Sequence, residues 1–215
     1  YKNKPKVIFN NTVVNGVILE KLSKLNTPII SRIPELETVM KIYQVRFNST
    51  NKVLKYSSNF ITPSLSGKKN LIDNFNIAQD KIEVAYGTIL KKSNLYAVNN
   101  EAELNKIGIP KDSFVAGACG GLGWRKGSDL FLKAAKHLSE FEKIVFMWVG
   151  VDKTQASYWE FVYEIKKLNL QTKVFTVPYI KDIHKYYQLM DVFLMTSRED
   201  PFPLVSLEAM TNGIP

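Results

Sequence analysis

Short apolar runs alternate with amphipathic stretches along the first half of the chain. The runs are brief and rich in β-branched or aromatic residues, which predicts buried strands of a parallel sheet. Between them, apolar positions recur at the three- and four-residue spacing of helices that pack one face against a core. The predicted strands are residues 7–9, 28–31, 59–62 and 82–85; the predicted helices begin near Val13, Glu35 and Val53, and after Ser64 as a capping residue.

The second half repeats this alternation with more apolar strands. Strands that alternate with helices indicate an α/β protein with mainly parallel sheets and helices on both sheet faces. We therefore expect two Rossmann-like domains, one in residues 1–90 and one in residues 113–215, joined by an irregular connection at 91–112. The predicted strands are residues 114–118, 144–149, 174–177 and 191–195, and the predicted helices cover 101–107, 128–138, 158–168, 183–190 and the stretch after Pro203.

Composition narrows the class of protein. The chain has 215 residues, 45% of them hydrophobic, which is enough to bury a core in each domain. A single cysteine, Cys119, excludes an internal disulfide and is expected to be a small buried residue. The two histidines are isolated, and there is no Cys–His cluster in the sequence, so no metal is expected.

The net charge of +9 lies almost wholly in the first half. Residues 1–112 carry 17 Lys+Arg and 9 Asp+Glu, a balance of +8, whereas residues 113–215 carry 12 and 11, a balance of +1. Such an excess attracts phosphates or an anionic membrane surface. A solvated, lysine-rich surface explains the same charge equally well. A nucleic-acid-binding protein is a third option that only the charge supports, because basic and aromatic residues are not interleaved on one stretch.

The C-terminal stretch carries the strongest candidate chemistry. It makes a polar turn after the last predicted strand and enters a helix, with Pro203 suited to the first helical position. Such a helix start lies at the carboxyl edge of the sheet and favours phosphate on its free amides, here near Phe202, Pro203 and Leu204. Asp200 in the turn and Glu208 inside the helix are suited to accept hydrogen bonds from sugar hydroxyls.

A glycine-rich loop after residues 114–118 is the second candidate. Gly121 and Gly123 let the backbone approach a phosphate closely, and Arg125 and Lys126 add positive charge before the next helix. The glycine spacing fits neither a Walker loop nor a dinucleotide-binding fingerprint.

Together, the two stretches resemble the donor site of the group 1 retaining glycosyltransferases (glycosyltransferase family 4). Seven residues separate Asp200 from Glu208-Ala209-Met210, and Gly213-Ile214-Pro215 follows, as in the family signature. Lys126-Gly127-Ser128-Asp129 resembles the Lys-Gly-x-Asp loop of the same family.

The chain departs from the family pattern at three points. Asp200 stands where most members have Glu. Ala118, Cys119 and Gly120 occupy the region where members carry an arginine that neutralises the donor diphosphate. Residues 33–37 contain no histidine, although related proteins often have a His-containing turn there.

The resemblance implies a two-domain GT-B fold, with both domains incomplete in this chain. It also implies transfer of a sugar from a nucleotide-diphosphate donor with retained configuration, without a metal or a cofactor. Three residues are the implied catalytic set: Lys126 neutralises the diphosphate, Asp200 holds the sugar and Glu208 holds the ribose. Arg125 is expected to replace the missing arginine.

The remaining donor-binding residues are implied by the same resemblance. Gly121 and Gly123 approach the phosphates, Gly150 contacts the nucleotide, and Pro178 and Tyr179 frame the base. Two aromatic residues leave alternatives open. Tyr179 either stacks on the base or is an ordinary packed loop residue, and Trp124 is expected to be a packing residue instead of a platform for a sugar.

The expected acceptor is a glycan or a lipid-linked sugar, in the synthesis of cell-surface polysaccharide. The expected location is the cytoplasm, with the basic first half resting on the inner face of the membrane. The alternative is a non-catalytic protein with a GT-B-like scaffold that holds a nucleotide sugar or a polyanion. The departures from the family pattern favour this alternative; turnover separates the two.

Overall fold

The computed structural model describes residues 4–89 and 100–215. The chain forms two compact units. The first comprises the residues up to Thr88 and, from much later in the sequence, Glu199–Phe202; the second comprises Ile89–Arg198 and Pro203–Pro215. Residues 91–99 of the expected connection lie outside the described residues, and its expected helix is present as α5 (Asn100–Ile107). In the part of the chain that is described, no helix is both long and apolar enough to span a bilayer.

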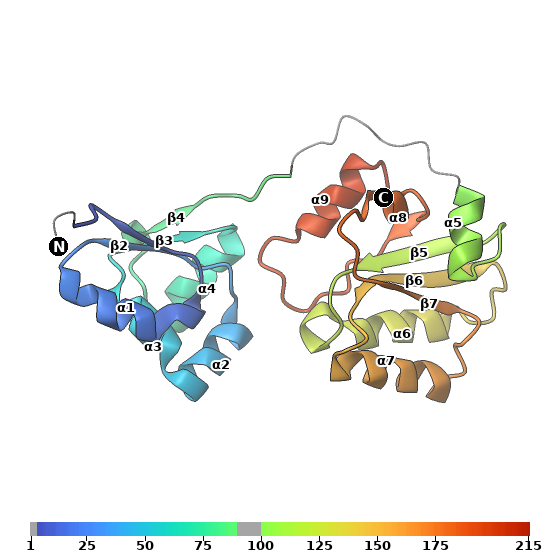
Figure 1. The fold of residues 1–215 in the computed structure, drawn as a ribbon, viewed down its shortest axis with the longest axis horizontal. Helices are drawn as coiled ribbons and strands as arrows, with labels where there is room; N and C mark the ends of the chain where they lie inside the picture. Colours follow the sequence, from blue (N-terminus) through green and yellow to red (C-terminus); the bar gives the residue numbers. More distant parts are fainter. Residues whose placement is uncertain (1–3, 90–99) are drawn as a thin grey trace. The chain divides into compact units, whose positions relative to one another are not determined.

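The first unit is built on a parallel four-stranded sheet with strand order β1-β2-β3-β4 (Figure 1). Each strand expected from the apolar runs is present, with bounds that differ by at most one residue. The strands are β1 (Ile8–Asn10), β2 (Ile29–Arg32), β3 (Asn59–Thr62) and β4 (Ile82–Val84). The helices are α1 (Gly16–Leu22), α2 (Glu37–Phe47), α3 (Ser49–Tyr56) and α4 (Leu65–Phe75), with 3-10 turns at Val13–Asn15, Ser23–Leu25 and Gln79–Lys81.

The described helices of the first unit cover one face of its sheet, so the expectation of helices on both faces is wrong here. Their buried residues join Ile29, Phe60 and Ile82 of the strands in a single core. On the other face, Ile30 is only half-buried and Phe9 is 58% exposed. The reason is topological. Right-handed crossovers between strands in consecutive order place every connecting helix on the same face.

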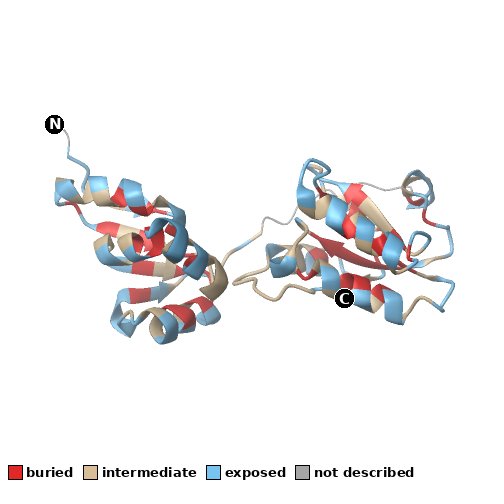
Figure 2. Cartoon of the chain, turned by 90° about the horizontal axis from the view of Figure 1, so that it is seen from below, coloured by how far each residue is buried: buried red, intermediate tan, exposed pale blue. Residues whose placement is uncertain are grey.

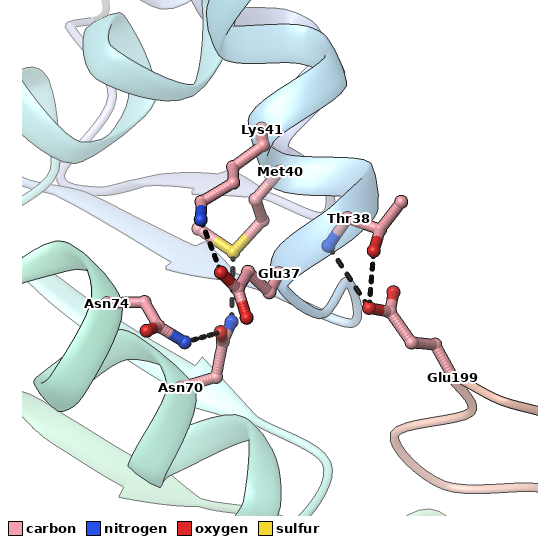
Figure 3. Close-up of polar contacts among 7 residues, drawn as sticks. All are labelled: Glu37, Thr38, Met40, Lys41, Asn70, Asn74 and Glu199. Carbon is pink, nitrogen blue, oxygen red and sulfur yellow. Dashed lines mark hydrogen bonds and ion pairs between the residues drawn. The ribbon is translucent and has the colours of Figure 1, made fainter.

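Side chains cap two helices of the first unit. Ser64 accepts a hydrogen bond from the Gly67 amide at 3.1 Å, which confirms the expected cap of α4. Helix α2 begins at Glu37 because Leu36 is still extended. The amide and the hydroxyl of Thr38 both donate to Glu199 Oε1, at 3.3 and 2.6 Å (Figure 3). A carboxylate from late in the sequence thus caps the positive end of α2.

The second unit contains a second parallel sheet, with strand order β7-β6-β5-β8. Its strands are longer than those of the first unit, except for β8. They are β5 (Phe114–Cys119), β6 (Ile144–Val151), β7 (Val174–Pro178) and β8 (Val192–Phe193). The helices are α6 (Ser128–His137), α7 (Ala156–Lys167), α8 (His184–Tyr187) and α9 (Leu204–Thr211), with a 3-10 turn at Trp124–Lys126.

Helices cover both faces of this second sheet, as expected. Helices α6 and α7 pack on one face through Phe131, Leu132 and Phe161, whereas α5, α8 and α9 pack on the other (Figure 1). The buried positions gather on the strands and on the helix surfaces that face them (Figure 2). The strand order explains this arrangement. The chain runs from β5 through β6 to β7 in one direction and then returns to the far side of β5, so the later crossover falls on the opposite face.

Two local expectations for the last strand and helix need correction. The strand predicted at residues 191–195 shortens to Val192–Phe193, which pairs with β5 at the edge of the sheet. Pro203 is the N-cap of α9 and not its first helical residue. Its ψ of 95° is extended, and its carbonyl accepts a hydrogen bond from the Ser206 amide at 3.1 Å.

Candidate functional site

The strand order of the second sheet reverses at β5. Strand β6 follows β5 on one side, and β8, the last strand in the sequence, lies on the other. All four strands are parallel, so their carboxyl ends and the loops after them share one edge. In open α/β sheets, ligands bind in the crevice at this edge where the strand order reverses. The glycine-rich loop follows β5, and the loop that leads to α9 follows β8, so both predicted stretches lie there.

The loop after β5 bends back over its own start. Gly120 and Gly123 adopt φ values of 132° and 140°, which side chains rarely tolerate. The indole N–H of Trp148 donates to the Gly120 carbonyl at 2.8 Å, which fixes this turn. The side chain of Lys126 then lies over Gly120: a Cβ atom on Gly120 would be 3.4 Å from Lys126 Cε and 3.8 Å from Nζ. The lysine ammonium is therefore held beside the bare backbone at the end of β5.

Two adjoining cavities open beside this turn. One of about 320 Å³ is lined by Gly120, Gly121, Gly150 and Tyr179, together with side chains of Cys119, Val149, Ile180, Lys181, Ile183 and Val205. A second of about 620 Å³ shares Gly121, Gly150 and Tyr179 with the first, and adds Val151, Asp152, Lys153, Thr154 and Pro178. The structure thus brings four of the predicted donor-binding residues together at one edge: Gly121, Gly150, Pro178 and Tyr179.

Tyr179 and Gly150 both line the two cavities, the first with an aromatic side chain and the second with its backbone. The Tyr179 side chain is 76% exposed, so the interpretation of this residue as a packed loop aromatic is wrong. Gly150 has a φ of 101°, and a Cβ atom there would lie 3.3 Å from the Gly120 carbonyl oxygen. Because neither glycine has a side chain, their backbone atoms form part of the cavity wall and are accessible to a ligand.

Glu208 reaches the same end of β5 from helix α9. The hydroxyl of the fully buried Tyr187 donates to Glu208 Oε2 at 2.8 Å, which orients the carboxylate. The pKa of the neighbouring Cys119 thiol is raised to about 12, mainly by burial, and the hydrogen bond with Tyr187 opposes this rise. The charge of Glu208 contributes to the raised pKa, whereas the charge of Lys126 opposes it. Glu208 and Lys126 therefore both affect the pKa of Cys119. Cys119 itself is buried, as expected.

The loop after β8 makes hydrogen bonds and an ion pair with the segment that carries Lys126. Arg198 makes a bidentate pair with Asp129, with both N···O distances at 2.7 Å. The hydrogen bonds from Arg198 lower the pKa of Asp129. Partial burial raises this pKa by a smaller amount, so the net shift is downward. The Arg198 guanidinium also lies over the Trp124 ring, 5.3 Å from its centre.

Trp124 is not the packing residue that was expected, because its side chain is 57% exposed. It lines a separate hollow of about 240 Å³ between α6 and α7, together with Gly123, Asp129 and Glu160. Gly123 thus lies in the predicted loop but lines a different hollow from Gly121.

Four other predicted site residues line neither of the two adjoining cavities. Asp200 and Phe202 are half-buried and belong to the first unit, where the Phe202 ring lies 5.9 Å from that of Tyr86. Arg125 is exposed, and its carbonyl accepts a hydrogen bond from the Arg198 amide at 2.8 Å. Leu204 is the first residue of α9 and is also exposed.

Sequence reasoning missed Tyr187, Lys181, Val205 and Arg198. Tyr187 has a helical spacing typical of a core residue, and nothing in the sequence links its hydroxyl to a carboxylate 21 residues later. Lys181 could have been noticed as a cation two residues after the predicted base-binding residue Tyr179. Within residues 4–89 and 100–215, no group of three or more His, Cys, Asp or Glu is placed to hold a metal ion.

The second unit is an open α/β domain with a glycine-lined crevice at the carboxyl edge of its sheet, beside which Lys126 lies. Residues 99–215 match the family model described as Glycosyl transferases group 1. This match covers more than half of the chain, so the chain belongs to the group 1 glycosyl transferases.

Individual relatives agree with this family. The Escherichia coli O-antigen biosynthesis glycosyltransferase WclY is 30% identical over 112 residues, which are 51% of this chain and 30% of that protein. A Campylobacter jejuni N-acetylgalactosamine-N,N'-diacetylbacillosaminyl-diphospho-undecaprenol 4-alpha-N-acetylgalactosaminyltransferase is 29% identical over 154 residues, 71% of this chain and 39% of that protein. The chain therefore matches about two fifths or less of the length of these relatives.

A solved structure shows the same fold. Anabaena Alr3699/HepE, in complex with UDP-glucose, matches 98% of this chain and 58% of its own chain, with a TM-score of 0.79 at 20% identity. The chain thus has the α/β architecture of the GT-B glycosyltransferases, with two parallel four-stranded sheets.

Gly127 is the tightest point between the two loops and generates a stability prediction. Its φ is 67°, and a Cβ atom there would lie 1.9 Å from the Thr196 carbonyl oxygen. Gly127→Ala should lower the free energy of unfolding by about 3 kcal/mol or more, because backbone strain costs about 1–2 kcal/mol and overpacking about 1–3 kcal/mol. Urea denaturation measures this change.

Gly121→Ala is the matched control, because a Cβ atom at Gly121 would have no neighbour within 4 Å. It should change the unfolding free energy by no more than about 0.5 kcal/mol. Equal stability of the two variants would contradict the close contact at Gly127.

Proposed function

We propose that the second unit binds the nucleotide-diphosphate sugar donor of a retaining, metal-independent glycosyltransferase. The observation that carries this proposal is the position of Lys126 over Gly120, beside a cavity at the reversal of strand order. The resemblance to the group 1 family implies that the lysine of the Lys-Gly-x-Asp loop, here Lys126, neutralises the donor diphosphate. The lysine ammonium is a compact charge that suits this ligand.

Each part of the donor has a proposed partner. The diphosphate lies against the bare backbone of Gly120 and Gly121, with its charge balanced by Lys126 and by Arg125. The base lies beside Tyr179, whose exposed ring offers a stacking surface, and beside the backbone of Gly150.

Two carboxylates hold the sugars of the donor in this proposal. Glu208 accepts hydrogen bonds from the ribose, and the buried Tyr187 hydroxyl keeps that carboxylate oriented. Asp200 accepts hydrogen bonds from the sugar that is transferred, as its place in the family signature implies. The Leu204 amide at the start of α9 contributes to phosphate binding in this proposal.

The proposed reaction needs no cofactor. The bond between the anomeric carbon and the diphosphate oxygen breaks, and the acceptor oxygen bonds to the same face of that carbon. The acceptor proton passes to an oxygen of the departing diphosphate. Lys126 stabilises the negative charge that grows on this leaving group.

The acceptor is proposed to be a glycan or a lipid-linked sugar used for cell-surface polysaccharide. The names of two relatives support this: one takes part in O-antigen biosynthesis, and the other acts on a diphospho-undecaprenol. A lipid-linked acceptor lies in a membrane, and the proposed place of the enzyme is the inner membrane face. The basic balance of the first 112 residues would supply such contact.

A non-catalytic donor-binding protein is the second candidate function. Asp200 in place of the usual Glu, and Ala118-Cys119-Gly120 where the family has an arginine, favour it. Such a protein would use the same cavity and the same lysine, but would have no turnover.

Removal of the Lys126 ammonium tests the proposed donor site. Lys126→Ala in the full-length protein should weaken binding of the best-bound nucleoside diphosphate by about 10–100-fold, because a charged contact is lost. Lys136→Ala is the control, since Lys136 is an exposed lysine in the last turn of α6. Calorimetry on folded variants measures both affinities, and an unchanged affinity for Lys126→Ala would remove this residue from the site.

Removal of the charge of Asp200 or of Glu208 should change different kinetic parameters. Asp200→Asn should lower kcat far more than donor affinity, because its proposed partner is the sugar that moves in the transition state. Glu208→Gln should raise the donor KM with a smaller change in kcat, because the ribose does not change during the reaction. Steady-state kinetics with a matched donor measure both. Normal turnover of Asp200→Asn would refute its role, and absence of turnover in the parent protein would favour the binding-protein function.

Membrane contact should depend on salt. The full-length protein should bind vesicles that contain anionic phospholipid at low ionic strength and release them as salt rises, because charges are screened over roughly 8 Å at physiological ionic strength. Lys21→Glu with Lys24→Glu, two exposed residues of the first unit, should weaken this binding. Lys136→Glu gives a control with one reversed charge in the second unit. Sedimentation that is independent of salt, or absent at low salt, would contradict the proposed contact.

A further inference from the structure

Two residues after β8 hold three consecutive carbonyl groups of the loop after β5. The Thr196 hydroxyl donates to the Lys126 carbonyl at 3.0 Å, and the Arg198 amide donates to the Arg125 carbonyl at 2.8 Å. Arg198 Nη1 donates to the Trp124 carbonyl at 2.9 Å. The backbone from Trp124 to Lys126 is therefore held from one side at every residue.

The guanidinium of Arg198 is occupied by this loop and not directed at a ligand. Nη1 and Nη2 bind the two carboxylate oxygens of Asp129, and the plane lies over the Trp124 ring. A bidentate fork of this kind restrains both orientation and distance, which a lysine at the same position could not do. The ion pair is partly open to water, with side chains 25% and 49% exposed, so it adds little to overall stability.

The geometry points to Arg198 as a positioning residue for Lys126. By fixing the Trp124–Lys126 backbone, Arg198 and Asp129 hold the lysine ammonium over Gly120, where the donor diphosphate would lie. Arg198 does not touch the donor itself. This inference rests on the proposed function. It implies that Asp129, the Asp of the Lys-Gly-x-Asp loop, supports donor binding by holding Arg198 and not by contact with the donor.

A double-mutant cycle in the full-length protein tests the inference. UDP, GDP, ADP, CDP and dTDP are first compared, and the tightest is used with its parent nucleoside as the probe that lacks phosphate. Arg198→Met should weaken nucleoside diphosphate binding by roughly 3–10-fold, the size of couplings between contacting residues. It should leave binding of the nucleoside unchanged. In a Lys126→Ala background, Arg198→Met should cause no further loss.

Two further variants separate positioning from a general loss of structure. Asp129→Asn should weaken nucleoside diphosphate binding in the same direction as Arg198→Met, because it breaks the bidentate pair from the other side. Asp129→Arg combined with Arg198→Asp restores an ion pair and should recover part of the affinity. Thermal denaturation of every variant shows which ones are folded, and Asp129→Asn serves if Arg198→Met does not fold.

The outcomes distinguish the inference from the function on which it rests. If Lys126→Ala weakens diphosphate binding but folded Arg198→Met and Asp129→Asn do not, the positioning role is wrong and the donor site stands. If Arg198→Met and Lys126→Ala are additive, or if nucleoside binding falls equally, Arg198 acts in another way and the inference is overturned. If none of the nucleoside diphosphates binds, or Lys126→Ala has no effect, the proposed donor site and the inference both fail.

Discussion

The second unit depends on the reversal of strand order at β5. The reversal brings the loop after the first strand of this sheet beside the loop after its last strand, although about 70 residues separate them in the sequence. It also sends α8 and α9 to the face opposite α6 and α7, so that Glu208 and Lys126 approach Cys119 from different elements. In a sheet of consecutive order, such as that of the first unit, these two loops would lie at opposite ends.

The contacts that follow from this reversal form one connected system. Gly127 allows the two backbones to meet, the Thr196–Arg198 segment binds the carbonyls of the Lys126 loop, and Trp148 fixes the turn at Gly120. These contacts restrain the backbone that carries Lys126 and the turn over which its side chain lies. A cationic group held in place before the ligand arrives binds a diphosphate more tightly, because less conformational freedom is lost on binding.

The strands and most helices could be predicted from the sequence, because apolar runs and helical periodicity are local signals. The donor-site stretches could be predicted from their resemblance to a family, and the structure groups Gly121, Gly150, Pro178 and Tyr179 around adjoining cavities. The pairing of Arg198 with Asp129 could not be predicted, since a bidentate contact across 69 residues leaves no local pattern. The exposure of Tyr179 and Trp124 was equally hidden, because an aromatic residue in a loop gives no sign of whether it is covered.

Every proposed role depends on the binding of a nucleoside diphosphate at the reversal of strand order in the second unit. A crystal structure of the full-length protein with its best-bound nucleoside diphosphate tests this most directly. Phosphate oxygens should lie about 3 Å from Lys126 Nζ and from the backbone at Gly120–Gly121, with the base beside Tyr179. A nucleotide bound elsewhere, for example in the hollow between α6 and α7, with Lys126 free of phosphate, would contradict it.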